Sequence, residues 1–385
     1  MVGFTPVRRW RSLFERRSRS DEASTLAAIR YWLPRWRFAA IRITERVLVG
    51  GEVSLHSVSN WSKDVPDQGA HLVHRQGYSA EQIIGPIFFS TESEHMSKRV
   101  EEEWYHSPAR FQYILSDVCF DPASATPWIE GSYLLAGVAQ FGTDPRWSDV
   151  AYQWTRKARW LKTSQTVIVA PNYPNYYHFL IEEMPAFLAA MDLVGREGLV
   201  LLRQGAPEWV KNALRFAGFQ WTEVPRSPLR ARTYAVATRS LMKPSPEDWS
   251  LLHEHFIPRA EVSSDRASDR IYISRIGHSR STSWEPELQA RLSDSGWRVV
   301  DPGHIELKEQ IELFSSATLV AGLSGAALAN VAWMREGSSL VSLGPPTSEH
   351  GHLWMRLAEL SGAHFHYINP HGMSAGSLHR RLMGL

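Results

Sequence analysis

Residues 318–330 have the sequence TLVAGLSGAALAN, which indicates a strand, a tight turn and a helix in succession. The apolar run at the start is typical of a buried parallel strand, and the glycines at 322 and 325 permit a sharp turn with close backbone approach. From Ala326 the residues favour a helix that continues to Met334. The first N–H groups of such a helix can bind a phosphate, although small residues also serve simply to pack a helix on its sheet.

Composition and length indicate a globular protein of two domains. The 385 residues are 43% hydrophobic and 11% aromatic, enough for large cores. No run approaches the roughly 18 apolar residues of a membrane span, and the N-terminus lacks the apolar centre of a signal peptide, so we expect a cytoplasmic protein. The single cysteine, Cys119, excludes an intramolecular disulfide and a cysteine-cluster metal site, and we interpret it as a buried apolar side chain.

Charge is unevenly distributed along the chain. The overall net charge is +2 and makes no case for nucleic acid binding, but residues 1–46 hold eleven arginines and four acidic residues, a local charge of +7. Tryptophan and phenylalanine alternate with these arginines up to residue 39. Residues 1–39 are therefore predicted to be a basic tail that either lies on an anionic membrane surface, at the inner face of the membrane, or is solvated and disordered.

The hydrophobic pattern divides the rest of the chain into two halves. Short apolar stretches separated by turn residues predict an irregular β-rich region over 40–165, and strands then alternate with helices to residue 242. Residues 243–260 are predicted to be a linker. Five strands with four intervening helices predict a Rossmann-like domain over 261–385, although no strand is followed by the GxGxxG of dinucleotide-binding proteins. The predicted helices span about 175–193, 207–217, 285–294, 306–315 and 352–360.

A histidine and a glutamate share one face of the first predicted helix. His178 and Glu182 are four residues apart, and Asn175 precedes them by one turn. A histidine beside a carboxylate can act as a general base near neutral pH. An isolated histidine more often caps or packs its helix, and the pair also has the spacing of two metal ligands, but no third ligand is evident.

Charged side chains follow the strands of the second half. Arg275 and Arg280 come just after its first strand, where guanidinium groups are suited to phosphate oxygens, although surface arginines are common in this chain. Glu309 is near the N-terminus of an amphipathic helix and complements the helix dipole there.

Four motifs, in this order and spacing, resemble glycosyltransferase family 61 over roughly residues 166–345. They are Asn-x-x-His-x-x-x-Glu-x-x-Pro at 175–185, Tyr-Ile-Ser-Arg at 272–275 with Arg280, Glu-Gln-Ile at 309–311, and Gly-x-x-Gly-Ala at 322–326 ending at Asn330. The chain departs from the family at Ser324, where histidine is usual, and at Trp284, where asparagine is usual. These departures are compatible with an altered donor or with lost activity.

The resemblance implies two Rossmann-like domains facing a cleft, the GT-B arrangement. It implies sugar transfer from a nucleotide-sugar, with inversion and with no essential metal or cofactor, to a glycan or lipid-linked acceptor in surface polysaccharide synthesis. A non-catalytic member that binds a glycan or a partner enzyme is the alternative, and a two-domain sugar epimerase is less favoured because paired carboxylates are not evident.

Roles follow from this reaction. His178, oriented by Glu182, is the predicted base, and Asn175 and Tyr177 are on the acceptor side. The residues predicted to bind the donor and its phosphates are Arg275, Arg280, Ser324, Gly325, Ala326, Asn330 and Glu309.

Overall fold

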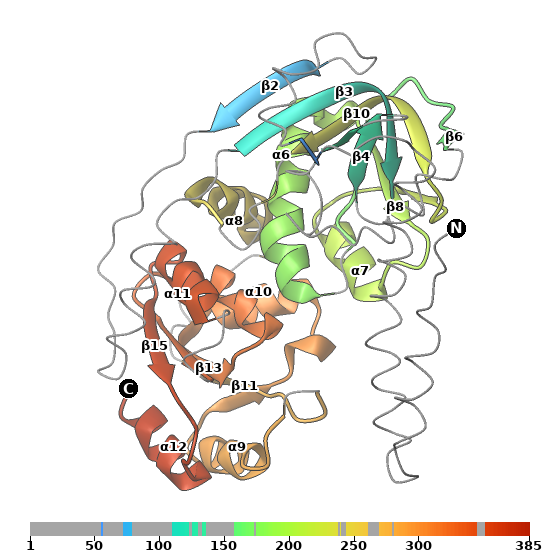
Figure 1. Cartoon of the computed structure of the whole chain (residues 1–385). Coiled ribbons are helices and arrows are strands. Elements are labelled where there is room, and N and C mark those ends of the chain that lie inside the picture. Colours follow the sequence, from blue (N-terminus) through green and yellow to red (C-terminus); the bar gives the residue numbers. More distant parts are fainter. Residues whose placement is uncertain are drawn as a thin grey trace, which may run out of the picture. The chain divides into compact units, whose positions relative to one another are not determined.

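The computed structural model of the chain describes residues 55–56, 72–78, 110–122, 125–129, 133–135, 158–172, 175–237, 239, 244–260, 269–278, 281–344 and 351–385 (Figure 1). All of these residues belong to one compact unit, which comprises 54–145 and 157–385. The predicted basic tail, 1–39, lies outside the described residues. None of the helices in the described segments is long and apolar enough to cross a membrane.

The larger sheet is mixed and joins the β-rich region to the first α/β half. Its strands are β1 (Leu55–His56), β2 (Leu72–Tyr78), β3 (Arg110–Asp121), β4 (Thr126–Ile129), β5 (Tyr133–Leu135), β6 (Arg159–Trp160), β7 (Val167–Val169), β8 (Leu199–Arg203), β9 (Thr222–Val224) and β10 (Leu229–Ala237). Strand β10 pairs antiparallel with β3 and parallel with β7, and β7, β8 and β9 are parallel to one another. The predicted parallel strands thus form one side of the sheet. On the other side the sheet continues with β3, which runs antiparallel to β10.

The helix predicted at 175–193 consists of two parts. A π-helical segment, η2 (His178–Glu183), leads into α6 (Met184–Val194). Pro185 has no N–H to donate to the preceding turn, which accounts for an irregular ladder just before it. The 3₁₀ turn η3 (Gly195–Glu197) then leads to β8, and α7 (Glu208–Phe216) and α8 (Pro246–Ala260) complete this half.

The smaller sheet has the five parallel strands that the sequence predicts. In spatial order they are β12 (Arg298–Val300), β11 (Asp269–Ile273), β13 (Ala317–Leu323), β14 (Ser339–Leu343) and β15 (His364–Ile368). Because β12 lies on one side of β11 and the later strands on the other, the strand order reverses at β11. A crevice opens at such a reversal, beyond the carboxyl ends of the two strands.

The helices of this half connect its strands in turn. They are α9 (Glu285–Asp294), the 3₁₀ turn η4 (Pro302–His304), α10 (Leu307–Ser315), the 3₁₀ helix η5 (Ala326–Trp333), α11 (Gly351–Leu360) and α12 (Ala375–Met383). The helix predicted after Ser324 is therefore of the tighter 3₁₀ type. The pattern of short apolar runs did not predict α12.

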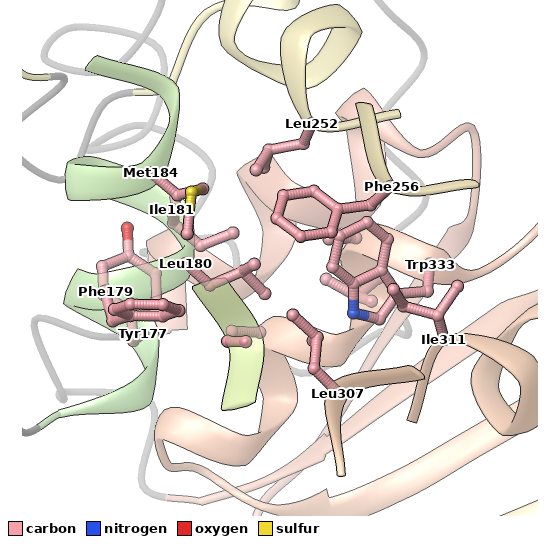
Figure 2. Close-up of a cluster of buried hydrophobic side chains, with 14 of the residues drawn as sticks. Tyr177, Phe179, Leu180, Ile181, Met184, Leu252, Phe256, Leu307, Ile311 and Trp333 are labelled. Carbon is pink, nitrogen blue, oxygen red and sulfur yellow. The ribbon is translucent and has the colours of Figure 1, made fainter. Parts of the chain in front are cut away.

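One hydrophobic core includes side chains from both sheets and their helices. Figure 2 shows Leu180 and Ile181 of η2, Phe256 of α8, Ile311 of α10 and Trp333 of η5 in this cluster, with the rings of Phe256 and Trp333 next to each other. Phe256 and Trp333 are buried, and each such side chain contributes about 1.5–3 kcal/mol by burial. Most of the predicted linker is thus α8, a helix that packs against α6, α10 and η5. The two-domain GT-B arrangement stays a prediction.

Candidate functional site

A pocket of about 520 Å³ lies where the strand order of the smaller sheet reverses. Its walls include Arg275 after β11, Asp301 after β12, and Gly325 after β13. Tyr176, just before η2, and Trp209 of α7 also line the pocket, from the first α/β half. The volume is in the range of small-molecule sites, and the carboxyl ends of parallel strands at a reversal are the usual ligand position in such sheets.

Arg275 is held in place at both its backbone and its side chain. Its N–H donates to Oε1 of Glu285 at 2.7 Å, and its Nη1 donates to the carbonyl oxygen of Ser324 at 2.8 Å. Glu285 is buried at the start of α9 and also accepts from the hydroxyl of Tyr272 at 3.3 Å. Burial, together with the nearby Glu285 carboxylate, raises the pKa of Tyr272 well above its usual range, so this hydroxyl keeps its proton. The loop that carries Arg275 is therefore fixed to α9.

At position 325, glycine is the one residue type that fits beneath this guanidinium. Its backbone is extended, with φ of 174°, so the conformation itself does not demand glycine. A Cβ at this position would overlap Nη1 of Arg275 and would lie 2.8 Å from its Cζ. The close approach of Arg275, rather than the turn geometry, thus explains the glycine.

The start of η5 forms the floor beside Gly325. Ala326 and Ala327 line the pocket, and the first bond of the 3₁₀ helix is donated by the Leu328 N–H to the Gly325 carbonyl at 2.9 Å. The N–H groups of Ala326 and Ala327 precede that bond and have no partner within the helix. Of the N–H groups predicted to bind an anion, that of Ser324 instead donates to the Leu343 carbonyl at 2.9 Å, whereas Gly325 and Ala326 line the pocket.

Ser324 and Tyr177 are grouped around a buried tryptophan and do not line the pocket. The Oγ of Ser324 accepts from Nε1 of Trp354 at 2.8 Å, and Trp354 is 2% exposed. The Tyr177 ring, also buried, packs edge-on against Trp354 with centroids 5.6 Å apart. The Ser324 carbonyl, rather than its hydroxyl, connects this residue to Arg275.

The predicted base and its orienting carboxylate are in contact. Nδ1 of His178 lies 2.9 Å from Oε2 of Glu182, whose side chain is 3% exposed, whereas that of His178 is 28% exposed. When Nδ1 donates its hydrogen to the carboxylate, Nε2 is left as the basic nitrogen. Neither residue lines the pocket, but Asn175, three residues before His178, does so. The two side chains are thus paired with each other, outside the residues that line the pocket.

Two of the predicted donor-binding residues have other surroundings. Asn330 is buried, and its Oδ1 accepts from the hydroxyl of Tyr176 at 2.9 Å while its Nδ2 donates to the Ala327 carbonyl at 3.1 Å. Burial raises the pKa of Tyr176 well above its usual range. Glu309 is exposed in the first turn of α10 and does not line the pocket. Arg280 lies outside the described residues.

The structure adds pocket residues that the sequence did not predict. Gln310 is buried and donates from Nε2 to the carbonyls of Pro302 and Ile305, at 3.1 and 2.8 Å, which fixes the loop after β12. Glu306 accepts from Nδ2 of Asn212 at 3.2 Å, a bond from α10 to α7. Gln310 is the middle residue of the Glu-Gln-Ile motif, and this position in the motif was the available sequence signal that it belongs to the site.

A carboxylate with two histidines completes this wall. Oδ2 of Asp301 lies 3.1 Å from Nε2 of His278 and 3.0 Å from Nδ1 of His304. Burial alone would raise the pKa of Asp301, but hydrogen bonds from His278 and the Gly303 N–H, with the charges of both histidines, together lower it. An aspartate directly after a parallel strand was the signal for this cluster. Within the described segments, no three histidine, cysteine, aspartate or glutamate side chains are arranged to hold a metal ion.

Comparison with known families agrees with the motifs. Residues 176–341 match the family model described as Glycosyltransferase 61, a segment that runs from Tyr176 through the pocket to β14. No curated protein shows significant sequence similarity to the chain. The family predicted from the four motifs is confirmed, and the match contains every pocket residue named above except Asn175. Residues 176–341, the segment that holds the pocket, are thus similar to glycosyltransferase family 61.

Proposed function

We propose that this protein is an inverting glycosyltransferase that needs no metal ion and transfers a sugar from a nucleotide-sugar to a glycan or lipid-linked acceptor. Membership of the family supports glycosyl transfer in general. The observation that carries the finer proposal is the position of Arg275, fixed above Gly325 in a pocket at the carboxyl ends of β11 and β13. A diphosphate leaving group requires positive charge and N–H donors in that place.

The donor diphosphate would bind between Arg275 and the start of η5. Arginine presents several N–H donors in a planar fork, and Ala326 and Ala327, at the start of η5, line the same pocket. Arg280, five residues after Arg275, is the second proposed phosphate ligand. The sugar would then extend toward Tyr176, Asn175 and Trp209, which also line the pocket.

Transfer would begin with proton removal from the acceptor hydroxyl by Nε2 of His178. As the acceptor oxygen attacks the anomeric carbon from the face opposite the diphosphate, the bond from that carbon to the phosphate oxygen breaks. The electron pair leaves with the diphosphate, and Arg275 stabilises the charge that develops there. Glu182 would hold the imidazole orientation and stabilise its protonated form.

A non-catalytic, glycan-binding role is the second candidate, and one contact favours it. Ser324 stands where the family usually has histidine, and its hydroxyl is engaged by Trp354 rather than facing the pocket. A serine in this position supplies no charge for a leaving phosphate. Donor hydrolysis in the absence of acceptor separates the two roles, because only an enzyme breaks the donor.

A panel of nucleotide-sugars, screened by thermal shift and then by calorimetry, tests the proposal. A ligand of the folded state must raise the melting temperature. We expect Arg275→Ala to weaken binding of the stabilising donor, and of its nucleoside diphosphate, by about tenfold to a hundredfold. Arg291→Ala is the matched control, since Arg291 is on the surface of α9 and pairs with Glu287. Equal affinity in wild type and Arg275→Ala would refute this phosphate site.

We further propose that the protein acts in surface polysaccharide synthesis and that it does so in the cytoplasm, at the inner face of the membrane. The charge of +7 within residues 1–46 and the interleaved aromatic residues support it. Flotation with anionic vesicles should depend on residues 1–39 and weaken with salt. Equal flotation of the full chain and of a chain without residues 1–39 would refute the membrane contact.

A further inference from the structure

Two histidines share one carboxylate oxygen at the wall of the pocket. His278 contacts Oδ2 of Asp301 through Nε2, and His304 contacts the same oxygen through Nδ1. All three residues line the pocket. The imidazoles are well exposed, with side chains 46% and 82% accessible, whereas Asp301 is 25% accessible. Each ring therefore has one nitrogen directed to Asp301 and a second nitrogen available for another partner.

Two adjacent loops place these side chains beside Arg275. The segment after β11 turns back at Gly277, whose φ of 84° is in the left-handed region, so that the His278 N–H donates to the Arg275 carbonyl at 3.0 Å. The segment after β12 begins with Asp301, whose Oδ1 accepts from the Gly303 N–H at 3.0 Å and so starts the turn that carries His304. Both loops end at the crevice in which Arg275 lies.

The charge of this cluster depends on the two imidazoles. Imidazoles change charge within about pH 5–8, and the lowered pKa of Asp301 keeps its carboxylate ionised over that range. The three groups together carry +1 when both rings are protonated and −1 when both are neutral. The other ionisable groups on the described pocket wall are Arg275, Glu306 and Tyr176, and the raised pKa of Tyr176 keeps that hydroxyl neutral.

We propose that His278 and His304, oriented by Asp301, form a second anion-binding arm of the pocket that contacts the donor's diphosphate beside Arg275. This inference rests on the proposed function, because it takes the pocket to be a diphosphate site. It follows that affinity for the diphosphate decreases as the pH rises through the range in which imidazoles lose their protons. Among the described residues that line the pocket, Arg275 would thus be joined at the diphosphate by two imidazoles.

A purely structural role is the alternative, in which the histidines only tie the two loops together. Two substitutions separate the roles because they keep the hydrogen bond and remove the charge. The amide nitrogen of glutamine takes the place of Nε2, so His278→Gln can still donate to Asp301. The amide nitrogen of asparagine takes the place of Nδ1, so His304→Asn can do the same.

The experiment measures inorganic pyrophosphate binding to the full chain by calorimetry at about pH 6 and about pH 8.5. Pyrophosphate itself titrates, and the ratio of variant to wild-type affinity at each pH cancels that effect. His379→Gln is the control, because His379 is on α12 and bonds to Ser295, at the end of α9 away from the pocket. Thermal unfolding of each variant confirms that the fold is retained.

We expect each variant to bind pyrophosphate about tenfold more weakly than wild type at the lower pH and nearly as tightly as wild type at the higher pH. His379→Gln should match wild type at both. Affinity ratios near one at both pH values, with wild-type binding that still depends on Arg275, would overturn the second arm and leave the proposed function intact. An absence of pyrophosphate binding in wild type at both pH values would overturn the phosphate site and this inference together.

Discussion

The guanidinium of Arg275 occupies the space that any side chain at position 325 would need. A Cβ on Gly325 would overlap Nη1 and lie 2.8 Å from Cζ, while the same Nη1 donates to the neighbouring Ser324 carbonyl. The glycine in the turn after β13 and the arginine after β11 thus depend on each other for their packing, although 49 residues separate Arg275 from Ser324. The absence of a side chain at 325 is what allows the cation to reach the pocket floor.

Gly325→Ala should displace the guanidinium without unfolding the protein. The overlapping atoms belong to the flexible end of Arg275, and the extended backbone at 325 accepts alanine without strain. We expect pyrophosphate affinity to decrease about tenfold, with a change in unfolding free energy of less than about 1 kcal/mol, measured by calorimetry and by urea unfolding. Gly376→Ala is the control, because a Cβ there meets neighbours only at 3.9 Å or more. Unchanged affinity in Gly325→Ala would show that the position of Arg275 does not govern anion binding.

His178→Ala should abolish transfer while leaving donor affinity and the fold nearly intact, because the proposed base acts on the acceptor. General-base removal costs roughly a hundredfold or more in rate. Glu182→Gln keeps a hydrogen-bonding side chain beside Nδ1 but removes its charge, so we expect a smaller loss in kcat. Steady-state rates combined with donor calorimetry check both. A rate in His178→Ala above about a tenth of wild type would make this histidine structural.

The second half was the more predictable part of the fold. Parallel strands buried on both faces form continuous apolar runs, and α9 at Glu285–Asp294 has the predicted bounds. The partner of a strand is not encoded in its own residues. The pairing of β10 with β3 therefore could not be predicted, although the β-rich region and the strands up to residue 242 were assigned to the same half of the chain.

The predicted site residues that come just after a strand line the pocket, except where side-chain direction decides, as at Ser324. Arg275, Gly325 and Ala326 line the pocket because the carboxyl ends of parallel strands converge there. The Ser324 hydroxyl instead points to Trp354, a residue of α11 that no local pattern connects with this turn. The cluster around Asp301 was missed for a related reason, since its members come from two loops separated by α9.

Asp301→Asn should lower the unfolding free energy at neutral pH, and this loss should become smaller as the pH falls into the acidic range. Its pKa is lowered in the folded protein, so the fold favours the ionised carboxylate. That contribution is fully present above the unfolded value of 3.8 and is lost as the pH falls through the lower, folded value. Urea unfolding of wild type and variant from neutral to acidic pH measures the difference. Glu312→Gln, in an exposed pair with Lys308, is the control and should change stability by less than about 0.5 kcal/mol. A difference that does not shrink in acid would contradict the assignment.

The hydrogen bond from Tyr176 to Asn330 should couple the start of η2 to η5 across 154 residues. Tyr176→Phe leaves the buried Oδ1 of Asn330 without this donor, which should cost about 1–3 kcal/mol of unfolding free energy. In a double-mutant cycle with Asn330→Ala, we expect a coupling energy of about 1 kcal/mol by urea unfolding. Tyr234→Phe removes another buried tyrosine hydroxyl bond, to the carbonyl of Ala125 just before β4, and should be additive with Asn330→Ala. Additivity of Tyr176→Phe with Asn330→Ala as well would mean that this bond does not join the two pocket walls.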